Sequence, residues 1–452
     1  MNTIREILET PVEEAGDVLV AGAGSAGVAA AIAAARAGAK VTLVDPAGFP
    51  GGTLVSGIPI GGSFDGKRQV VRGILQEMID RLTARGGCDD DPSRTTWVNV
   101  DVEKLKIIIL EMLEEAGVHL RLHTLLVSAV VSGGKLEAAV VEGKAGRRAL
   151  RTARFIDATG DADLASYAGA KVVKGRGRDG LMQPMTMMFA VANIDLKRFE
   201  VWGGYTRLEK LWTEVSSAEN FRNPRRDGLS YMWGASCRVG EKAFNVTRVL
   251  HSDGADAKSL SNAEVEGRLQ AWEFMEKFLR PHVAGFEKAY ISWTSAKIGV
   301  RETRRIVGEY VLTRDDIWNF VKFPDAINCG SYPIDIHSPT DHTTEYPTDH
   351  FYGGKYWTIP YRCLVPVGVE NLLVAGRCLS ATHEALSAVR VMANTIGMGE
   401  AAGYASALSL KEGVSPRHLD PEIVRQMLLK HGGWLGELET ATPDQETLLP
   451  CK

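Results

Sequence analysis

Cysteine is scarce in this chain, with 6 among 452 residues, at positions 88, 237, 329, 363, 378 and 451. No two of them form a C-x-x-C pair, the spacing that zinc and iron–sulfur sites commonly use. The scattered spacing argues against both kinds of metal site. It also favours reduced thiols, so we expect a cytoplasmic protein.

The chain has no excess of positive charge. Its 52 Lys and Arg residues stand against 56 Asp and Glu, and the net charge is −4. No extended basic face is visible, so nucleic acid is not an expected partner. The first ten residues carry acids and no apolar core, so we expect no secretory signal, and no internal repeat is evident.

Long hydrophobic runs are also missing, although one segment comes close. Residues 18–35 are 18 uncharged residues, which is the length of a short membrane span. Nine of them are alanine, three are glycine and only five are large aliphatics. Moving this segment into a bilayer would therefore gain little hydrophobic free energy. Glycine-rich turns and a second strand directly afterwards do not suit a bilayer, and we expect no membrane span.

That same segment carries the most informative pattern of the chain. An apolar strand runs into Gly22, Gly24 and Gly27, and an alanine-rich helix and a second strand ending in Asp45 follow. In dinucleotide-binding folds the first glycine permits a tight turn, the second lets a pyrophosphate approach the backbone, and the third lets the helix pack closely. The helix N-terminus favours the negative charge of the pyrophosphate. Asp45, eighteen residues past Gly27, is placed to accept hydrogen bonds from a ribose diol.

A second match to the glycine pattern shows how weak the pattern is alone. Residues Gly175–Gly180 fit the same expression, but no alanine-rich helix follows and Pro184 interrupts the continuation. We interpret this second match as a surface or active-site loop.

Apolar strands that end in glycine occur at both ends of the chain. Phe155–Gly160 leads into Asp161, and Asn371–Arg377 precedes a small-residue helix over 394–410. In doubly wound sheets, ligands lie beyond the carboxyl ends of the strands. Gly22, Gly160 and Gly376 would then converge on one extended ligand, which favours FAD over NAD.

The segments between these strands predict a domain plan. An amphipathic helix is expected over 102–116, stopped by Gly117, and a β-hairpin over 122–141. Between about 170 and 355 the composition changes, with most of the tryptophans and a mixed-charge helix near 261–280. We predict an α/β fold: a Rossmann-like, doubly wound FAD-binding domain with a β-meander, built from 1–168 and 356–452. An inserted α+β substrate or cap domain would occupy 169–355.

Further motifs join the first one. They are Gly51-Gly-Thr53, Ala158-Thr-Gly-Asp161, Arg301-Glu-Thr-Arg304, Ser331–His337, Pro360–Leu364, Leu373–Arg377 and Ala381–Glu384. Together they resemble the FAD-dependent oxidoreductases of the glutathione-reductase-type flavoprotein superfamily, and more narrowly the large bacterial group known simply as FAD-dependent oxidoreductases. The resemblance covers about residues 17–410. It implies the fold and FAD as the cofactor, whereas the substrates of the group are mostly unassigned.

The resemblance also implies which residues hold the cofactor. The pyrophosphate would lie on the turn that contains Gly22, Gly24, Ser25, Ala26 and Gly27, and the adenosine ribose on Asp45, where many relatives carry a longer glutamate. The segment Gly51, Gly52 and Thr53 would lie beside the phosphate nearer the flavin. The backbone of Val127 would meet the adenine.

At the flavin end the resemblance implies three further groups. Thr159, Gly160 and Asp161 follow a strand of the sheet, and Gly376 and Arg377 would border the flavin chain. The helix starting near Asn394 would direct its positive end at the pyrimidine edge of the flavin and stabilise the reduced anion.

One departure from the superfamily is informative. Disulfide reductases of this superfamily continue Gly-Gly-Thr with a redox cysteine pair, but here Leu54–Pro59 follows without cysteine. A second nicotinamide-binding fingerprint is missing as well. Dithiol chemistry at this place is excluded, and electrons are not expected from NAD(P)H through a dedicated domain.

Two histidines are candidates for the base that flavin hydride transfer needs. The usual pKa of histidine suits proton removal near neutral pH, which makes His337 a candidate. Asp335, two residues away, would lie on the same side of a strand and orient His337. Tyr332 begins the same segment and is counted with the catalytic candidates. His383 follows Arg377 by six residues. The alternatives are a surface histidine at 337 and a structural histidine at 383.

A cluster of arginines is a candidate substrate clamp. Guanidinium forks bind carboxylates with two parallel hydrogen bonds, so Arg301 could grip an acidic substrate. For Arg304 and Arg305 we favour structural ion pairs with nearby glutamates. Tyr361, Arg362 and Arg390 are weaker candidates for contact with the substrate.

Two readings of the polar residues are less favoured. His337, His342 and His350, with the aspartates at 335, 341 and 349, do not follow a familiar metal-ligand spacing, so no metal site is predicted. Covalent attachment of flavin at Cys378 or His383 is the other alternative.

The sequence therefore predicts an FAD enzyme that moves a hydride between flavin and a small polar substrate bearing a hydroxyl or amine. The alternatives are a fumarate-reductase-like flavoprotein that reduces a carbon–carbon double bond beside a carboxylate, and a non-catalytic flavin-binding protein. The electron acceptor and assembly into a homo-oligomer stay open.

Overall fold

The computed structural model describes residues 3–88, 90–225, 232–233 and 238–436. Cys237, Cys451 and the outermost residues of the predicted FAD-binding domain, 1–2 and 437–452, lie outside this range. Four cysteines of the described part, at 88, 329, 363 and 378, are buried.

A five-stranded parallel sheet organises the larger part of the molecule. Its order is β21 (Leu372–Val374), β10 (Arg154–Asp157), β2 (Val18–Ala21), β3 (Val41–Val44) and β6 (His119–Arg121). Asp157 is level with both Val374 and Ala21, so three carboxyl ends coincide at one edge of the sheet. The predicted α/β fold with a parallel sheet is confirmed, and β21 lies in the same sheet as β2.

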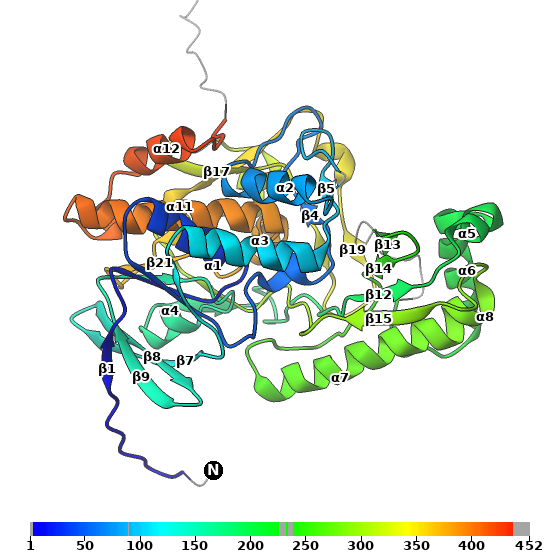
Figure 1. Ribbon diagram of the computed structural model, residues 1–452, viewed down its shortest axis with the longest axis horizontal. Helices are drawn as coiled ribbons and strands as arrows, with labels where there is room; N and C mark the ends of the chain where they lie inside the picture. The colour runs from blue at the N-terminus through cyan, green and yellow to red at the C-terminus, as the bar shows by residue number, and fades with distance from the viewer. Residues whose placement is uncertain (1–2, 89, 226–231, 234–237, 437–452) are drawn as a thin grey trace, which may run out of the picture.

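Helices cover one face of this sheet and a β-meander covers the other. The helices are α1 (Ser25–Arg36), α2 (Ile74–Ala84), α3 (Val102–Glu115) and α11 (Met392–Lys411). The meander consists of β7 (Leu125–Ser132), β8 (Lys135–Gly143) and β9 (Gly146–Arg151), with β1 (Val12–Glu14) parallel to β9 and α4 (Asp163–Tyr167) nearby. The two faces of β2 differ accordingly, because Val18 and Val20 pack in the helix core and Leu19 and Ala21 pack in the meander core. Figure 1 shows the helices above the sheet and the meander below it.

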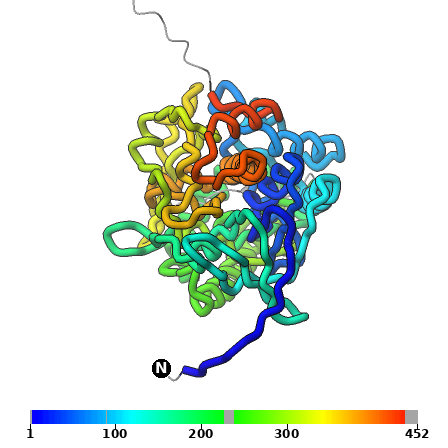
Figure 2. Tube along the Cα trace, turned by 90° about the vertical axis from the view of Figure 1, so that its left-hand side faces the viewer, coloured from blue at the N-terminus to red at the C-terminus, as the bar shows by residue number. Residues whose placement is uncertain are grey.

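Small residues let α1 and α11 lie backbone against backbone. A Cβ added to Gly399 would lie 2.1 Å from the carbonyl oxygen of Ala26, and one added to Gly403 would lie 2.2 Å from that of Ala30. Both helices are almost entirely buried. Figure 2 shows them side by side near the middle of the molecule, although they come from opposite ends of the chain.

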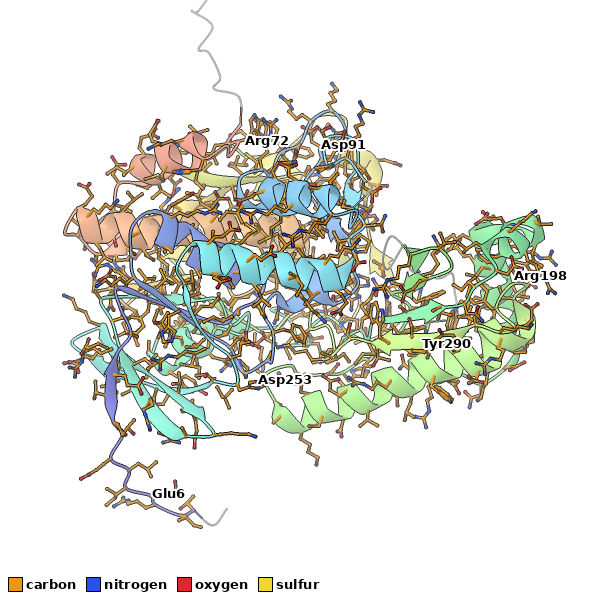
Figure 3. The ribbon with its side chains drawn as sticks, in the orientation of Figure 1. Glu6, Arg72, Asp91, Arg198, Asp253 and Tyr290 are labelled. Carbon is orange, nitrogen blue, oxygen red and sulfur yellow. The ribbon has the colours of Figure 1, made fainter. Side chains whose placement is uncertain are left out.

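A second unit extends from one side of the parallel-sheet part. Its antiparallel sheet has the order β13 (Met232–Trp233), β14 (Lys242–Phe244), β12 (Phe189–Ala192) and β15 (Tyr290–Thr294). The helices α5 (Leu196–Trp202), α6 (Gly204–Ala218), α7 (Ala257–Glu273) and α8 (Arg280–His282) accompany it, and a π-helical turn over Phe274–Leu279 joins the last two. Figure 3 labels Asp253 at the near end of this unit and Arg198 at its far end.

The second unit has an aromatic core of its own, formed by Phe189, Trp212, Phe244, Phe274 and Phe278 among others. Trp212 makes edge contacts with Phe274 and Phe278 at ring centroid distances of 5.0 Å. The unit is therefore held by its own side chains rather than by the parallel sheet. An ion pair between Asp253 and Lys174 is one of its links to the larger part.

The predicted domain boundary at residue 355 differs from the observed packing. Strand β17 (Ala326–Gly330) pairs with β20 (Trp357–Pro360), and Ile327, Cys329 and Ile334 pack in the same core as α1 and α11. The segment from Leu312 to residue 355 therefore packs with the parallel-sheet part rather than with the second unit. The remaining elements are β4 (Ile60–Gly61), β5 (Trp97–Val98), β11 (Val172–Lys174), β16 (Arg304–Ile306), α9 (Arg314–Trp318), β18 (Ile336–His337), β19 (Thr344–Glu345), α10 (His383–Val389) and α12 (Pro421–Lys430).

The local predictions agree with the structure. The helix over 102–116 and the hairpin around the Gly133-Gly134 turn are present, and the glycine-rich loop at 175–180 has no helix after it. The mixed-charge helix begins earlier than expected, at Ala257. Among the described residues, no helix combines the length and apolarity that crossing a membrane requires.

We expect Gly399→Ala to destabilise the protein by about 1–3 kcal/mol, because the new Cβ overlaps the backbone of α1. This loss opposes the gain of about 1 kcal/mol that alanine brings to a helix interior. Thermal unfolding followed by circular dichroism measures it. Gly177→Ala is the matched control, since a Cβ there meets no atom within 4 Å; an equal Tm for both variants would contradict the packing argument.

Candidate active site

A cavity of about 750 Å³ lies at the carboxyl edge of the parallel sheet and extends toward the second unit. Its lining brings together residues far apart in the sequence. From the predicted cofactor set it includes Gly22, Gly24, Ser25, Ala26, Asp45, Gly52, Thr53, Thr159, Gly160, Asp161, Gly376 and Arg377. Ligands of open α/β sheets bind at this edge, so the cavity is the candidate active site.

The glycines of the first motif form a cradle that side chains would fill. Gly22 has φ +97°, and a Cβ there would lie 2.5 Å from the carbonyl oxygen of Ala158. A Cβ on Gly27 would lie 1.7 Å from the carbonyl oxygen of Gly22. Gly27 is therefore a packing residue and does not line the cavity, whereas Gly24 has open space before it and does.

Two helix N-termini meet at this cavity. Neither the N-cap of α1, Gly24, nor that of α11, Val391, makes a side-chain capping bond, and the hydroxyl groups of Ser25 and Thr395 lie 2.8 Å apart. Uncapped N–H groups and two helix dipoles favour an anion such as a pyrophosphate or a reduced flavin. This double N-terminus, together with the glycine cradle, fits FAD.

Asp45 is the residue predicted to bind the adenosine ribose. It is 8% exposed and lines the cavity. Its Oδ2 accepts a hydrogen bond from Ala23 N (2.7 Å) and its Oδ1 accepts one from Ala47 N (2.8 Å). Each carboxylate oxygen has a second lone pair, so the group can hold the loop and still accept from a ribose hydroxyl.

The flavin-side residues are held by a network of their own. Asp161 Oδ1 accepts from Thr303 Oγ1 (2.7 Å) and from Arg377 Nη2 (2.9 Å). Gly160 has φ +79° and lies against the Arg377 guanidinium. The two predicted motifs therefore contact each other directly, although 216 residues separate Asp161 from Arg377.

Three further predicted cofactor residues are absent from the cavity lining. Gly51 is next to the cavity but packs against Val55, and Val127 packs against the outer residues of the meander. Asn394 is fully buried within α11, which begins at Met392, and its Nδ2 donates to Cys329 O (3.4 Å). Helix α11 presents Val391, Met392 and Thr395 to the cavity instead.

At the other end of the cavity the candidate base lies in a polar cluster. His337 Nε2 is 3.2 Å from Asp335 Oδ1, and His337 Nδ1 is 2.8 Å from Arg248 Nη2. Because Arg248 can only donate, Nδ1 carries no hydrogen in this arrangement. Burial and then the charge of Arg301 lower the pKa of His337 to about 3, so its ring is neutral. Burial opposes ionisation of Asp335, but His337, Arg390 and Arg301 outweigh it and hold the pKa of Asp335 well below its usual range.

Tyr332 lies beside this cluster. Its hydroxyl is 3.4 Å from Asp335 Oδ2, and its ring makes an edge contact with Trp97 at 5.6 Å between centroids. Burial raises the pKa of Tyr332 well above its usual value, so the hydroxyl keeps its proton. Tyr332, Asp335 and His337 all line the cavity.

His383 is not in the cavity lining. It is 5% exposed, and its Nδ1 lies 2.8 Å from Glu302 Oε2. Glu302 is itself buried and also binds Arg305 and the backbone N–H of Gln183 (3.1 Å). His383 thus belongs to a buried network one layer behind the cavity.

The arginines separate into two groups. Both Arg304 and Arg305 make structural ion pairs, but only Arg305 pairs with a glutamate as expected, Glu302, whereas Arg304 binds Asp163 and Asp161 O. Arg301 lines the cavity, as does Arg390. The other weak candidates, Tyr361 and Arg362, point elsewhere: the Tyr361 hydroxyl donates to Pro416 O (2.8 Å), and Arg362 pairs with Asp325 (2.9 Å).

Sequence reasoning missed Arg248, which lies 89 residues before His337 and belongs to no motif. It follows β14 of the second unit, and its backbone N–H donates to Gln270 Oε1 of α7 (2.8 Å). In the described part of the chain, no three His, Cys, Asp or Glu side chains are grouped as metal ligands would be. Cys378 is fully buried, with Sγ 3.6 Å from both Asp157 O and Ala375 O, and lies outside the cavity lining.

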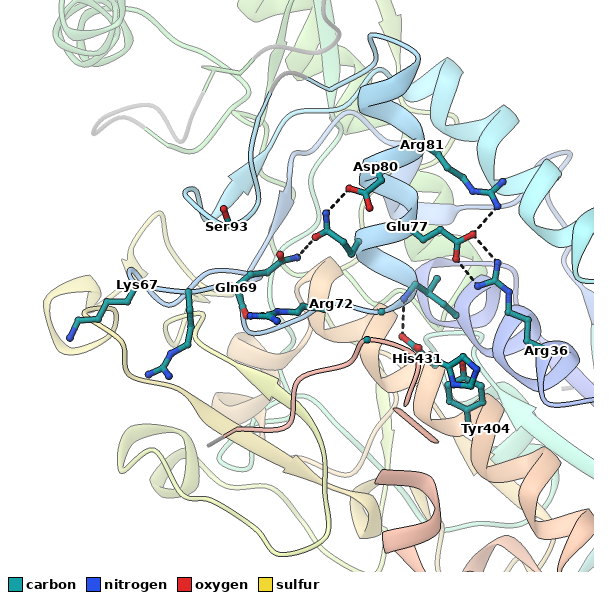
Figure 4. A pocket seen from close by; sticks show the side chains of 16 residues that line it. Arg36, Lys67, Gln69, Arg72, Glu77, Asp80, Arg81, Ser93, Tyr404 and His431 are labelled. Atoms are coloured by element: carbon teal, nitrogen blue, oxygen red, sulfur yellow. Dashed lines mark hydrogen bonds and ion pairs between the residues drawn. The ribbon is translucent and has the colours of Figure 1, made fainter. Parts of the chain in front are cut away.

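A second cavity, of about 910 Å³, opens beside the N-terminus of α2 (Figure 4). Ion pairs form one wall, where Glu77 binds Arg36 (2.6 Å) and Arg81 (2.8 Å). Glu400 lies in its floor next to Gly73, accepts from Ile74 N (3.1 Å), and is 3% exposed. Burial raises the pKa of this carboxyl from 4.5 to about 7.

We expect Glu400 to make stability fall as pH rises. Its folded-state pKa is raised, so its favourable contribution is complete below about pH 4.5 and is lost as pH rises through about 7. Glu400→Gln should therefore gain up to about 3 kcal/mol over the unaltered protein at pH 8 and little at pH 4.5. Chemical unfolding at both pH values measures this difference. Glu412→Gln, at the exposed C-cap of the same helix, is the control and should leave the pH slope unchanged.

We expect Asp45→Asn to weaken FAD retention by about tenfold, because an amide has one acceptor oxygen for two backbone donors and leaves one of them unpaired. Flavin absorbance after gel filtration at decreasing protein concentration measures retention. Asp17→Asn is the matched control, since Asp17 also accepts a backbone N–H, from Lys40 (2.7 Å), but at the opposite end of β2. Equal loss of flavin from both variants would contradict the role of Asp45.

Comparison with known proteins identifies the family of this chain. The family model for FAD dependent oxidoreductases matches residues 17–428. No curated protein matches this chain. Among solved structures, p-nitrophenol 4-monooxygenase PnpA from Pseudomonas putida DLL-E4 is similar at 14% identity and TM-score 0.47, over 93% of this chain and 86% of that one.

Two other solved structures are similar to the same extent. A geranylgeranyl bacteriochlorophyll reductase-like protein (Ta0516) from Thermoplasma acidophilum has 13% identity and TM-score 0.43, over 92% of this chain and 82% of that one. The flavin-dependent brominase Bmp2 has 13% identity and TM-score 0.45, over 92% and 83%. With TM-scores below 0.5, these similarities say nothing about the reaction. The family match over most of the chain does decide the class: this protein belongs to the FAD dependent oxidoreductase family, and FAD is its cofactor.

Proposed function

We propose that this protein transfers a hydride between FAD and a small polar substrate that bears a hydroxyl or an amine. The observation that supports this most is the single cavity that runs from the glycine cradle to the cluster of Tyr332, Asp335 and His337. Its two ends offer the two things such a reaction needs, a dinucleotide cradle and polar side chains for the substrate. We also propose membership of the glutathione-reductase-type superfamily, and cytoplasmic localisation.

The chain's own residues have definable roles in this proposal. Bound FAD would supply the hydride acceptor, N5 of the flavin. His337 is the proposed base, because of the two candidate histidines only His337 lines the cavity. Its Nδ1 is the ring nitrogen without hydrogen, and there it would accept the proton of the substrate's hydroxyl or amine once the ring leaves its contact with Arg248. Asp335 orients the ring through Nε2.

The second unit is the proposed substrate cap. Its residues Glu264, Ser295 and Lys297 line the same cavity as the glycine cradle. The side chain of Ser295 also donates to the carbonyl of Ser56, next to the proposed flavin-side loop, over 2.9 Å. These contacts would close the substrate end of the cavity against bulk water.

A specific observation also favours a second candidate reaction. Reduction of a carbon–carbon double bond beside a carboxylate would use arginines and a histidine around the acid, and Arg301, Arg390 and His337 all line the cavity. A flavin-binding protein without catalysis is the remaining alternative. The three possibilities differ in whether the flavin takes a hydride from the substrate, gives one to it, or exchanges none.

We expect the flavin absorbance band of the anaerobic protein to bleach with one class of compound among sugars, polyols, hydroxy acids and amines. Bleaching by one class supports the dehydrogenase or oxidase reaction and gives the substrate type. If none bleaches the band, but a reduced dye does and an unsaturated acid restores it, the double-bond reductase is supported instead. A flavin that exchanges electrons with no compound would leave the non-catalytic alternative.

We expect His337→Gln to slow flavin reduction by the active compound by about 100-fold or more, because general-base catalysis contributes about 10²–10⁴. Flavin content should stay unchanged, since His337 lies away from the glycine cradle. His383→Gln is the comparison: it should lower Tm through the Glu302 network and leave the rate per bound flavin within a few fold. Stopped-flow absorbance and thermal unfolding measure the two effects, and a reversed pattern would assign the base to His383.

A further inference from the structure

The substrate end of the cavity holds two arginines and one carboxylate that pairs with only one of them. Arg301, Arg390 and Asp335 all line it. Asp335 pairs with Arg390, and the ring of His337 beside it is neutral. Among the described residues, Arg301 is left without an ion pair in a largely buried space, which is costly without a bound anion.

Arg301 is the least compensated of these arginines. Its Nη1 donates to two neutral oxygens, Pro184 O and Thr186 Oγ1, both at 2.7 Å. Its Nε and Nη2 have no acceptor among the described residues, and none of the ion pairs of the described part includes it. Burial, and then repulsion by Arg390 and Arg248, lower the pKa of Arg301 to about 9, so it stays charged at neutral pH.

The free edge of Arg301 has a definite shape. Nε and Nη2 lie on one side of the planar guanidinium and point their hydrogens in parallel. This edge matches the two oxygens of a carboxylate, which accept such a pair of hydrogen bonds together. Thr186 and Pro184 hold the other side of the group, so the plane of the fork is fixed before a ligand arrives.

Arg390 provides a second donor next to this edge. Only its Nη2 is engaged, with Asp335 Oδ2 (3.3 Å), Asp335 O (3.1 Å) and Gln183 Oε1 (3.4 Å), while its Nε is buried and has no partner in the described part. Arg390 directly precedes Val391, the N-cap of α11. The arginine cluster and the helix end assigned to the flavin are therefore adjacent in the chain.

We propose that the substrate is a small carboxylic acid whose carboxylate binds the free edge of Arg301, with Arg390 beside it. This inference rests on the proposed function and specifies its substrate class: the reacting carbon, which carries the hydroxyl, the amine or the double bond, lies next to a carboxylate. Arg301 and Arg390 are then binding residues that place this carbon between the flavin and His337.

A bound carboxylate also changes the proton affinity of the proposed base, His337. Burial and then Arg301 hold the pKa of His337 down, and Arg390 adds to this, while Asp335 opposes them. Arg248 contacts the same ring. An anion on Arg301 cancels part of this positive field, so the proton affinity of His337 rises when the acid binds. Substrate binding and proton acceptance are thereby coupled.

The test is the binding of unreactive carboxylates to the FAD-loaded protein. Acetate and propionate are titrated against acetamide and propionamide, which have the same shape without the charge, and against inorganic phosphate. Binding is read from the perturbation of the oxidised flavin spectrum and from isothermal titration calorimetry. We expect the two acids to bind and the two amides to fail at equal concentration.

Variants locate the site. Arg301→Gln should weaken acetate binding by about 10- to 100-fold, since it removes a charge-assisted pair of hydrogen bonds. Arg301→Lys keeps the charge without the fork and should give an intermediate loss. Arg362→Gln is the matched control, because Arg362 pairs with Asp325 outside the cavity. If Arg301→Gln does not retain FAD, the comparison of acids with amides on the unaltered protein decides alone.

Two results would overturn the proposal: acids and amides that bind equally, or acetate binding that Arg301→Gln leaves unchanged. Tight binding of phosphate without binding of the acids would replace the carboxylate by a phosphate-bearing substrate and also overturn it. Failure of the proposed function looks different, because carboxylates would then bind at Arg301 while no acid, amine or alcohol exchanged electrons with the flavin.

Discussion

The structure depends on the contact between α1 and α11, two helices that meet through small residues. Gly399 and Gly403 let α11 approach the backbone of Ala26 and Ala30. This contact brings the N-terminus of α11 to the N-terminus of α1, so that Ser25 and Thr395 touch. Two helix dipoles then point at one edge of the sheet, and the anionic parts of FAD are the ligand that this arrangement suits.

The second organising constraint is electrostatic. Near His337, the described part of the cavity wall contains Arg301 and Arg390, and Asp335 pairs only with Arg390. A protein pays for buried charge unless a partner compensates it, so such an imbalance marks a ligand site more clearly than the individual residues do. Burial and then the charge of Arg301 keep His337 neutral, which is the state from which a base can accept a proton. Burial keeps Tyr332 protonated, although Arg390 opposes this.

Much of the cofactor end could be predicted, because each residue there has a local reason to be what it is. Gly22 needs its positive φ, Gly24 needs an open face, and Asp45 ends a strand beside the turn. These requirements produce a recognisable pattern within a segment of about thirty residues. The prediction for Asn394 differs from the structure, since the small-residue pattern gave the helix without showing which of its first residues face the cavity.

The substrate end could be predicted only in part. Asp335 and His337 are close in the chain, and a strand puts them on one side, so their contact was visible in the sequence. The contacts of Arg248 with His337 and of Glu302 with His383 span 89 and 81 residues, and no local pattern records them. The boundary near residue 355 was misplaced for a related reason: β17 joins the helix core through β20, a pairing that composition does not reveal.

The sequence by itself determined that two strand–glycine–helix segments form one dinucleotide-binding sheet, because backbone conformation and side-chain size act within a few residues. Only the tertiary structure decided which arginines meet at the substrate end and which of the two histidines lies in the cavity. Those outcomes depend on contacts between segments far apart in the chain. The free energy of a buried charge is set by the groups around it and not by the local conformational preference of the residue.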